Sequence, residues 1–418
     1  MYQPRIAIIG GGPAGLTLGR LLHLRGIQTT IYDLRAKPTA EDLDQPCGML
    51  DLHEESGLSA IRDCGLWDEF MTLTGECSEE TKVYDSEAKL LHQDFGGSAE
   101  GARPEISRHQ LLKLLMSSIP ADMVRWEHKV TSVERHVTET GSTEIIVDFG
   151  PKGKASFDLV IGADGAWSKV RALLTPTKPH YSGIQFISLD LKAVSTRHPR
   201  FAEFLGNGSM MSLGFHNGVL AQRGARGAVR MYLAVSTKDE DFGGKYGLKD
   251  KVPADAKATL LNDQDLFAKW NPIFKELIAA ACEESAEDDP TELLDVKPLY
   301  MLPVGHRWES GPGLTLVGDA AHLMTPFAGE GVNLATWDCQ DLATAIGDAV
   351  KAGAAGPTEF HSLLQPLIKQ YEDAMLDRAG EKAEETWSNK GMMFDTLDSS
   401  RNLAEFFQSA GLGPEQPS

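Results

Sequence analysis

RIAIIGGGPAGLTLGRLLHLRGIQTTIYD, residues 5–33, is the stretch that decides the fold. It begins with a short apolar run that ends at Gly10, where a glycine-rich turn follows. Residues 16–24 then have the apolar spacing of a helix, and residues 28–33 are typical of a strand. The stretch therefore predicts one βαβ unit with a tight turn between its first strand and its helix.

The turn GGGPAG fits the pattern G-x-G-x-x-G at Gly10, Gly12 and Gly15. Glycines let the backbone approach a pyrophosphate, and a helix that begins near Pro13 directs its free N–H groups at the phosphate charge. Asp33 ends the second strand, at about the place where an acidic side chain hydrogen-bonds a ribose hydroxyl. The glycine pattern alone is a weak signal, but strand, turn, helix and acid together predict a dinucleotide site. They do not distinguish FAD from NAD.

Composition limits the remaining possibilities. The 418 residues suit two joined domains, and 42% hydrophobic with 24% charged residues is typical of a globular protein. A formal net charge of −20 disfavours nucleic acid or an anionic membrane as a partner. Five cysteines without metal-ligand spacing predict reduced thiols and no metal site. With the first strand beginning at Arg5 and no apolar run long enough for a membrane span, we expect a cytoplasmic protein.

The middle and the end of the chain predict further elements. Short strands broken by Gly and Asn between residues 181 and 237 indicate an antiparallel sheet in a second domain. Residues 254–281 have helical spacing, and we expect the acidic run at residues 283–289 to be a solvated loop. A long helix is expected after Gly331 and another over about residues 359–389.

Two later motifs distinguish between the dinucleotides. DLVIGADGAWSKVR, residues 158–171, places Asp164 and a glycine at the tip of a strand. GDAAHLMTPFAGEGVN, residues 318–333, places Asp319 at a strand end, where it can accept from a ribityl hydroxyl. The turn at residues 329–333 opens a helix whose positive end would stabilise negative charge on a reduced flavin.

With these motifs in this order, the sequence resembles the FAD-dependent aromatic hydroxylases, and more closely the tetracycline-inactivating monooxygenases. It shares with the latter the stretches LDLH (50–53), EISR (105–108) and SKVR (168–171), and the resemblance spans residues 5 to about 385. It implies an α/β fold: a Rossmann-like FAD-binding domain of the glutathione-reductase-2, p-hydroxybenzoate-hydroxylase type, an interleaved mixed or antiparallel-sheet substrate domain, and a C-terminal bridging helix.

The implied domains are discontinuous. The FAD-binding domain would comprise residues 1–75, 101–178 and 300–355, the substrate domain residues 76–100 and 179–299, the C-terminal helix residues 356–395, and a frayed tail residues 396–418.

The resemblance also implies which residues bind the cofactor, and no catalytic side chain is among them. The implied cofactor-binding residues are Gly10, Gly12, Pro13, Ala14, Gly15, Asp33, Leu34, Arg35, Asp51, Arg108, Asp164, Asp319, Pro326, Gly329, Gly331, Val332 and Asn333.

Structural alternatives stay open for several of these positions. Asp51 is a possible helix cap, Arg108 a possible ion-pair partner of Glu105, and Asp164 a possible cap for the next helix. His322, within the third motif, is a possible core histidine.

The implied reaction is monooxygenation of a small aromatic or polycyclic secondary metabolite by a monomeric enzyme. NADPH or NADH reduces FAD, the reduced flavin traps O2 as a C4a-hydroperoxide, and the distal oxygen hydroxylates or epoxidises the substrate. The nicotinamide cofactor would dock transiently, because no second glycine-rich βαβ unit is evident. Where the tetracycline-inactivating enzymes have an arginine thought to contact NADPH, this chain has Asp44, and Arg35 or Lys37 are possible substitutes.

The expected substrate contacts differ from those of the tetracycline-inactivating enzymes. Their glutamine, arginine and histidine fall on Ser188, Met211 and Arg230, and only Phe327 is retained. Since unmatched polar groups in a binding site disfavour a ligand, tetracycline is not the leading substrate. Arg230 is the best candidate to contact an anionic or carbonyl group. A flavin oxidase or dehydrogenase of the same fold, tetracycline-type inactivation, and a flavin-binding protein without turnover remain alternatives.

Overall fold

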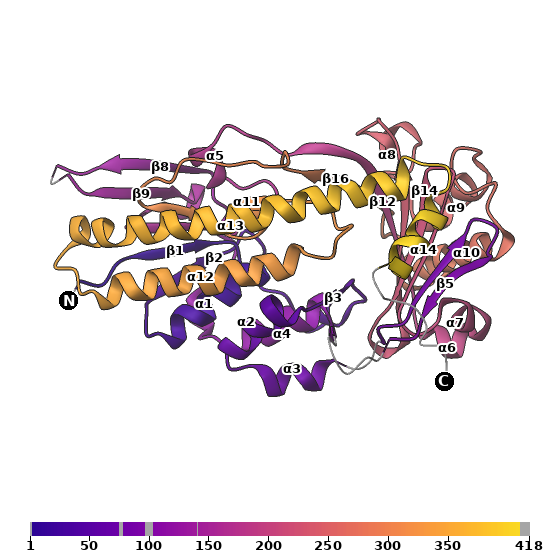
Figure 1. The fold of residues 1–418 in the computed structure, drawn as a ribbon, viewed down its shortest axis with the longest axis horizontal. Helices are drawn as coiled ribbons and strands as arrows, with labels where there is room; N and C mark the ends of the chain where they lie inside the picture. The colour runs from indigo at the N-terminus through magenta and orange to yellow at the C-terminus, as the bar shows by residue number, and fades with distance from the viewer. Residues whose placement is uncertain (1, 75–77, 97–102, 140, 410–418) are drawn as a thin grey trace.

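The computed structural model describes residues 2–74, 78–96, 103–139 and 141–409 (Figure 1). Five of the described strands form a parallel sheet in the order β17-β11-β1-β2-β7. Their bounds are β1 Ile6–Ile9, β2 Thr29–Tyr32, β7 Val124–Arg125, β11 Leu159–Gly162 and β17 Leu314–Leu316. All residues of β1 and β11 are buried, as expected for strands covered on both faces.

Three helices pack in one hydrophobic core with this sheet. They are α1 (Pro13–Leu24), α12 (Gly331–Lys351) and α13 (Pro357–Phe394). Figure 1 shows α12 and α13 side by side, and α13 continuing from the parallel sheet to the second half of the molecule. The Tyr371 hydroxyl donates to the Leu316 carbonyl at 2.7 Å, whereas Phe394 at the far end packs in the second half.

The second half is built on a mixed sheet in the order β16-β12-β15-β14-β13-β4-β5. The bounds are β4 Thr81–Asp85, β5 Leu90–Asp94, β12 His180–Leu191, β13 Ser209–Gly214, β14 Asn217–Arg223, β15 Val229–Ser236 and β16 Asp295–Met301. The pair β13–β4 is parallel and the other pairs are antiparallel. These two sheets and α13 confirm the predicted α/β fold, with a mixed second sheet and a bridging helix.

Each face of the mixed sheet has its own core, because side chains alternate along the strands. Ile187 and Leu189 of β12 pack in the core that includes α9 (Pro253–Asn262) and α10 (Pro272–Asp288). Phe186 points to the opposite face, where Phe327 and Phe394 pack. We call this opposite side the cleft face, because it faces the loop that carries Phe327.

Smaller elements complete the fold. A two-stranded ribbon pairs β3 (Met49–Asp51) with β6 (Glu105–Ser107), and a three-stranded sheet joins β8 (Ser132–Val137), β9 (Thr143–Asp148) and β10 (Lys154–Phe157). The shorter α-helices are α2 Ser59–Asp63, α3 Trp67–Leu73, α4 Arg108–Ser117, α5 Arg171–Leu174, α6 Val194–Arg197, α7 Pro199–Leu205, α8 Phe242–Lys245, α11 Asp319–His322 and α14 Ser399–Ser409. A π-helical turn covers Glu54–Leu58.

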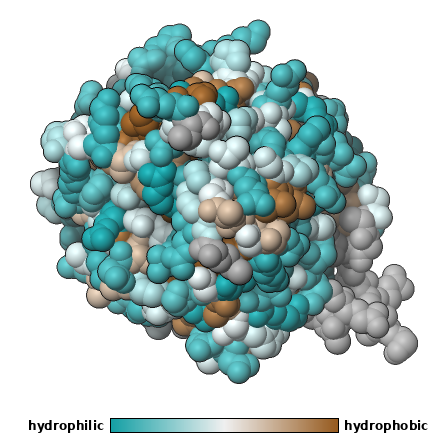
Figure 2. All heavy atoms as spheres, turned by 90° about the vertical axis from the view of Figure 1, so that its left-hand side faces the viewer, coloured by the Kyte–Doolittle hydropathy of each residue, from teal (hydrophilic) through white to brown (hydrophobic). Residues whose placement is uncertain are grey.

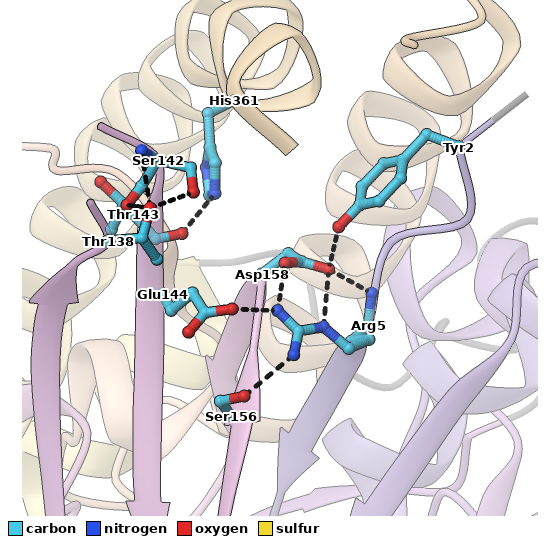
Figure 3. A network of polar contacts seen from close by, with 9 residues as sticks. All are labelled: Tyr2, Arg5, Thr138, Ser142, Thr143, Glu144, Ser156, Asp158 and His361. Carbon is cyan, nitrogen blue, oxygen red and sulfur yellow. Dashed lines mark hydrogen bonds and ion pairs between the residues drawn. The ribbon is translucent and has the colours of Figure 1, made fainter. Parts of the chain in front are cut away.

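A polar network fastens the first strand to the three-stranded sheet (Figure 3). The buried Asp158 carboxylate accepts from the Tyr2 hydroxyl at 2.7 Å and from Arg5 Nη2 at 2.8 Å. Arg5 also donates to Glu144 of β9 at 2.7 Å and to Ser156 of β10 at 2.9 Å. Since Arg5 precedes β1 and the glycine turn follows it, this network lies at the opposite edge of the sheet from the turn and is structural.

The expectation for the acidic run is wrong. The acidic run at 283–289 is not a solvated loop, because α10 continues to Asp288 and Glu284 is buried. Its carboxylate accepts from the Lys192 N–H at 2.8 Å and contacts His198 Nε2 at 2.6 Å, so burial is compensated by hydrogen bonds. The predicted helical span 254–281 is divided between α9 and α10.

The tail expected from residue 396 is also wrong over residues 399–409, which form α14. Leu403 and Ala404 are buried against the cleft-face core. Ser400 accepts from the Leu213 N–H at 3.0 Å, which anchors the helix to the sheet. Residues 410–418 lie outside the described part.

The end of the molecule formed by β8 and β9 has a mostly hydrophilic surface with small separated hydrophobic patches (Figure 2). Within the described ranges, no helix is both long and apolar enough to cross a membrane.

Candidate active site

The glycine turn has the geometry that a close backbone approach requires. Gly10 has a φ of +113°, and a Cβ there would lie 2.1 Å from the Ala163 carbonyl oxygen. A Cβ on Gly15 would lie 1.9 Å from the Gly10 carbonyl oxygen, whereas one on Gly12 would meet no described atom within 4 Å. At Gly10 the turn therefore packs against the residue that follows β11, whereas at Gly12, before α1, there is free space next to the backbone.

The open side of this turn is the N-terminus of α1. Among the described residues no side chain caps Gly12, and Pro13 at the first helical position carries no N–H. The N–H groups of the first turn, which include that of Ala14, therefore point with the positive end of the helix dipole at the open space. This arrangement fits a pyrophosphate.

Asp33 fastens the turn from the end of β2. Its carboxylate accepts from the Gly11 N–H at 2.7 Å and from Arg35 Nη2 at 2.8 Å. Burial raises the pKa of Asp33, but the hydrogen bonds from Arg35 and Gly11 outweigh it and the net pKa is lowered. Asp33 is therefore ionised, which suits an acceptor for a ribose hydroxyl, while the neighbouring Leu34 is exposed. The ribose contact itself remains a prediction.

Asp164 meets the glycine turn from β11. Its Oδ2 accepts from the Lys169 N–H at 2.7 Å, ahead of α5, whose N-cap is Val170 without a side-chain cap, so the capping alternative is not supported. Its Oδ1 is buried without a hydrogen-bond partner among the described residues. Burial raises the pKa of this carboxyl. An unsatisfied buried acceptor beside the turn is unusual in a native protein and fits a site that a ligand completes.

Asp319 begins α11 at the same edge of the sheet, and part of its surface is exposed. The residues packed around its carboxyl desolvate it and so raise its pKa, although the charges of His322, Arg108 and Arg171 oppose this effect. Arg171 reaches under α11 and donates to the Ala320 carbonyl at 2.9 Å. His322 is buried and bonded to Asp338 at 2.6 Å, so the core-histidine alternative is supported.

The start of α12 forms the third part of the site. Gly329 has a φ of +70°, and a Cβ on Gly331 would meet no described atom within 4 Å. Pro326 is exposed and Val332 is half-buried. Asn333 is buried, and its side chain bonds backbone atoms of the 51–53 segment at 2.9 and 3.0 Å. The side chain of Asn333 thus ties α12 to β3.

A charged cluster around His53 supports this helix start, and it was not predicted from the sequence. His53 Nε2 lies 3.1 Å from Asp51 Oδ2, and its Nδ1 lies 3.5 Å from Glu330 Oε2. Glu330 in turn pairs with Lys382 of α13 at 2.6 Å. Burial lowers the pKa of His53, but hydrogen bonds to the two carboxylates outweigh it and raise the pKa to about 9. Asp51 lies in β3 and does not cap the π-helical turn, whose N-cap is His53.

The ribbon β3–β6 carries a second carboxyl opposite Asp51. Glu105 is its direct cross-strand partner and accepts from Gln222 of β14 at 3.4 Å. Burial and then the charge of Asp51 raise the pKa of Glu105 to about 7. Within the described part, Arg108 makes no ion pair with Glu105, so that alternative is not supported. Its backbone N–H donates to the Gly48 carbonyl at 3.1 Å.

The structure brings the four predicted substrate residues to the cleft face. The register of the mixed sheet places Ser188, Tyr232, Leu220 and Met211 in one transverse row. Phe327 approaches this row through Phe186, at a ring-centroid distance of 6.1 Å.

The next row on the same face is polar and contains Asp190, Arg230 and Gln222. Arg230 Nη1 lies 2.6 Å from Asp190 Oδ2, so its charge is already compensated. A carbonyl group is therefore a better match for Arg230 than a free anion.

Together these parts can hold FAD. The α1 start suits the pyrophosphate, Asp319 the ribityl chain, and the positive end of α12 an electron-rich ring. The unsatisfied Asp164 oxygen and the open space before Gly12 and Gly331 are structural signs that the site is shaped for a ligand.

Comparison with known proteins supports this assignment. Residues 4–374 match the family model described as FAD binding domain. The chain is 34% identical over 414 residues to the monooxygenase penA of Penicillium thymicola, covering 92% of this chain and 94% of the relative. It is also 34% identical over 428 residues to the monooxygenase asqM of Emericella nidulans, covering 93% and 95%.

Solved structures share the fold at low sequence identity. A salicylate hydroxylase substrate complex aligns with a TM-score of 0.71 at 17% identity, over 97% of this chain and 94% of that chain. HpxO of Klebsiella pneumoniae, complexed with FAD and uric acid, aligns with a TM-score of 0.71 at 18% identity, over 98% and 93%.

Proposed function

Since the chain belongs to the FAD binding domain family and is an FAD-dependent monooxygenase, we propose that it uses NADPH or NADH and O2 to hydroxylate or epoxidise a small aromatic or polycyclic metabolite. The observation that carries this proposal is the aromatic cleft face, where Phe186, Tyr232 and Phe327 approach one another on the side facing the FAD-binding loops. A planar substrate would lie against these rings.

In this proposal the chain holds and orients both reactants. The α1 start would bind the pyrophosphate, Asp319 the ribityl chain, and the α12 start the flavin ring. When bound, FAD would supply electron transfer to O2 and the transfer of one oxygen atom. The aromatic row would fix the substrate carbon within reach and exclude water, which otherwise diverts the oxygen to hydrogen peroxide.

We assign His53 as a positioning residue for the flavin end of the site. It acts through Glu330 and the backbone of residues 329–331, which begin α12. Lys382 holds the other side of Glu330, so the helix start is fixed from both β3 and α13. A fixed helix start keeps its positive end directed at the ring, where negative charge develops on reduction.

The preference between NADPH and NADH would depend on which basic side chain can contact the 2′-phosphate of NADPH. Arg35 is held by Asp33, and Asp44 lies 4.0 Å from Arg226. Lys37 is therefore the better candidate of the two cations to contact a 2′-phosphate. We expect a modest preference for NADPH that Lys37→Ala abolishes.

Tetracycline is a weaker candidate substrate. Ser188 and Met211 stand in the middle of the cleft face and offer few polar contacts to such a ligand. An aromatic compound with one or two polar groups fits the transverse row better.

The test follows oxygen into product. Purified protein is expected to be yellow with bound FAD, and to oxidise NADPH or NADH when aromatic compounds such as salicylate or 3-amino-4-hydroxybenzoate are supplied. Reaction under ¹⁸O2 should give a product heavier by one labelled oxygen atom. Quantitative release of peroxide with every compound tried would favour an oxidase, and protein that takes up no FAD would refute the assignment.

A further inference from the structure

A cavity of about 370 Å³ lies between the two halves of the molecule, beyond the polar row of the cleft face. Residues 43–47 and α4 contribute one wall, and the ends of β12, β14 and β15 contribute the other. We call this space the seam cavity. Its size falls within the range of small-ligand sites, which occur preferentially at domain junctions.

The seam cavity continues the predicted substrate site. Arg230 lines it and stands next to Gln222, its cross-strand partner in the polar row. From the other half, Ser107 lines it and lies on the same face of the ribbon as Glu105, two residues earlier. Gln222 joins the halves here, because it accepts from the Met49 N–H at 3.1 Å and donates to Glu105. One face therefore runs from the aromatic row, past Gln222, into the cavity.

The charges around the cavity are balanced. Lys192 pairs with Asp288 at 2.7 Å and Arg230 with Asp190 at 2.6 Å. Arg226 Nη2 donates to the Asp44 carbonyl oxygen at 2.8 Å. Because each of these cations already has a carboxylate or carbonyl partner, an anion, including the phosphates of a nicotinamide cofactor, would gain less here than beside an unpaired cation. An uncharged group does not depend on an unpaired cation.

The remaining lining suits an aromatic group with a hydrogen-bond acceptor. Leu43, Pro46, Ala225 and Ala228 supply apolar surface. Arg230 supplies guanidinium N–H donors to this lining.

Two residues with strained backbone conformations also line the seam cavity. Two of the six described non-glycine residues with positive φ, Ala193 at 45° and Arg226 at 57°, line the cavity. Such conformations cost free energy and concentrate at functional sites.

We propose that the seam cavity binds the non-reacting end of the substrate, and that this end is an uncharged aromatic group bearing a carbonyl-type acceptor. The reacting carbon then lies over the aromatic row, and Gln222 marks the join between the two parts. This inference rests on the proposed monooxygenase function.

The test uses 2-naphthamide as the probe and 2-naphthoate as its anionic analogue, with the FAD-loaded protein. Calorimetry is expected to give a lower Kd for the amide than for the carboxylate. Ala228→Trp fills the cavity from a residue with an ordinary extended backbone, and is expected to raise the amide Kd about tenfold or more. Ala258→Trp, on the exposed side of α9, is the matched control and should leave the Kd unchanged.

A second readout does not depend on any variant. Cys47 lines the cavity and is partly exposed, whereas Cys64, Cys282 and Cys339 are buried. Saturating 2-naphthamide should slow carbamidomethylation of Cys47 by iodoacetamide, measured by mass spectrometry of its tryptic peptide.

Three outcomes would overturn the inference. They are tighter binding of 2-naphthoate, an amide Kd equal in Ala228→Trp and the wild type, and unprotected Cys47. Bound FAD and its reduction by NADPH are measured on the same samples. If both persist while the cavity tests fail, the inference falls and the proposed function stands.

Discussion

The charge on His53 is expected to stabilise the protein in a pH-dependent way. The pKa of its imidazole is about 9 in the folded protein, against an ordinary value of 6.5. Because the folded pKa is the higher one, this stabilisation is fully present below about pH 6.5 and is lost as the pH rises through 9. The difference corresponds to about 3 kcal/mol at most. Burial raises the pKa of Glu330, but its contacts with His53 and Lys382 outweigh burial and lower the pKa to about 2, so this shift includes the His53 contact and is not added.

The assay is urea unfolding at constant saturating FAD, from pH 6 to 10, for the wild type and His53→Gln. FAD must be fixed because bound ligand adds to the apparent stability. The difference in unfolding free energy should be largest at pH 6 and fall toward the alkaline end. His23→Gln, an exposed histidine in the last turn of α1, serves as the control. If the unfolding free energies of His53→Gln and the wild type differ by the same amount at every pH, the reasoning is refuted.

Further predictions concern the turn, the ribbon and the structural network. Gly10→Ala should lower FAD affinity at least tenfold, because its Cβ would collide with the Ala163 carbonyl, and flavin fluorescence titration checks this. An unchanged FAD Kd would contradict it. Glu105→Gln should remove a pH dependence of product formation centred near 7, where the pKa of Glu105 lies; a profile that keeps this inflection assigns it to another group. Asp158→Asn should cost about 2 kcal/mol of stability, since Arg5 and Tyr2 lose a charged partner, but leave FAD affinity unaltered. Calorimetric unfolding and FAD titration on the same sample separate these effects.

Short sequence motifs predicted those parts of the site whose residues are close together in the chain. The glycine turn is closed by sterics between Gly10, Gly15 and β11, so only one residue type fits and the motif is visible. The same holds for Gly329, whose positive φ permits the turn before α12.

The His53 cluster could not be predicted in the same way, because its partners come from distant segments. Asp51 is close in sequence, but Glu330 and Lys382 approach only when α12 and α13 pack. The prediction that the acidic run at residues 283–289 is a solvated loop is wrong for a related reason. Glu284 resembles a solvated residue in the sequence, and its partners Lys192 and His198 lie in a distant segment that follows β12. The amphipathic helix α14 was not predicted from the sequence, because polar residues precede it and the segment resembles a tail.

The mixed sheet combines strands from widely separated parts of the chain, and this has a consequence for the order of synthesis. β4 and β5 emerge from the ribosome early, but their neighbour β13 begins only at Ser209 and the opposite edge strand β16 ends at Met301. The fully buried side chains that α14 adds to the cleft-face core, Leu403 and Ala404, follow only after α13. The half of the protein that carries the proposed substrate face therefore completes its packing only after α14 has been synthesised, long after β1 and α1.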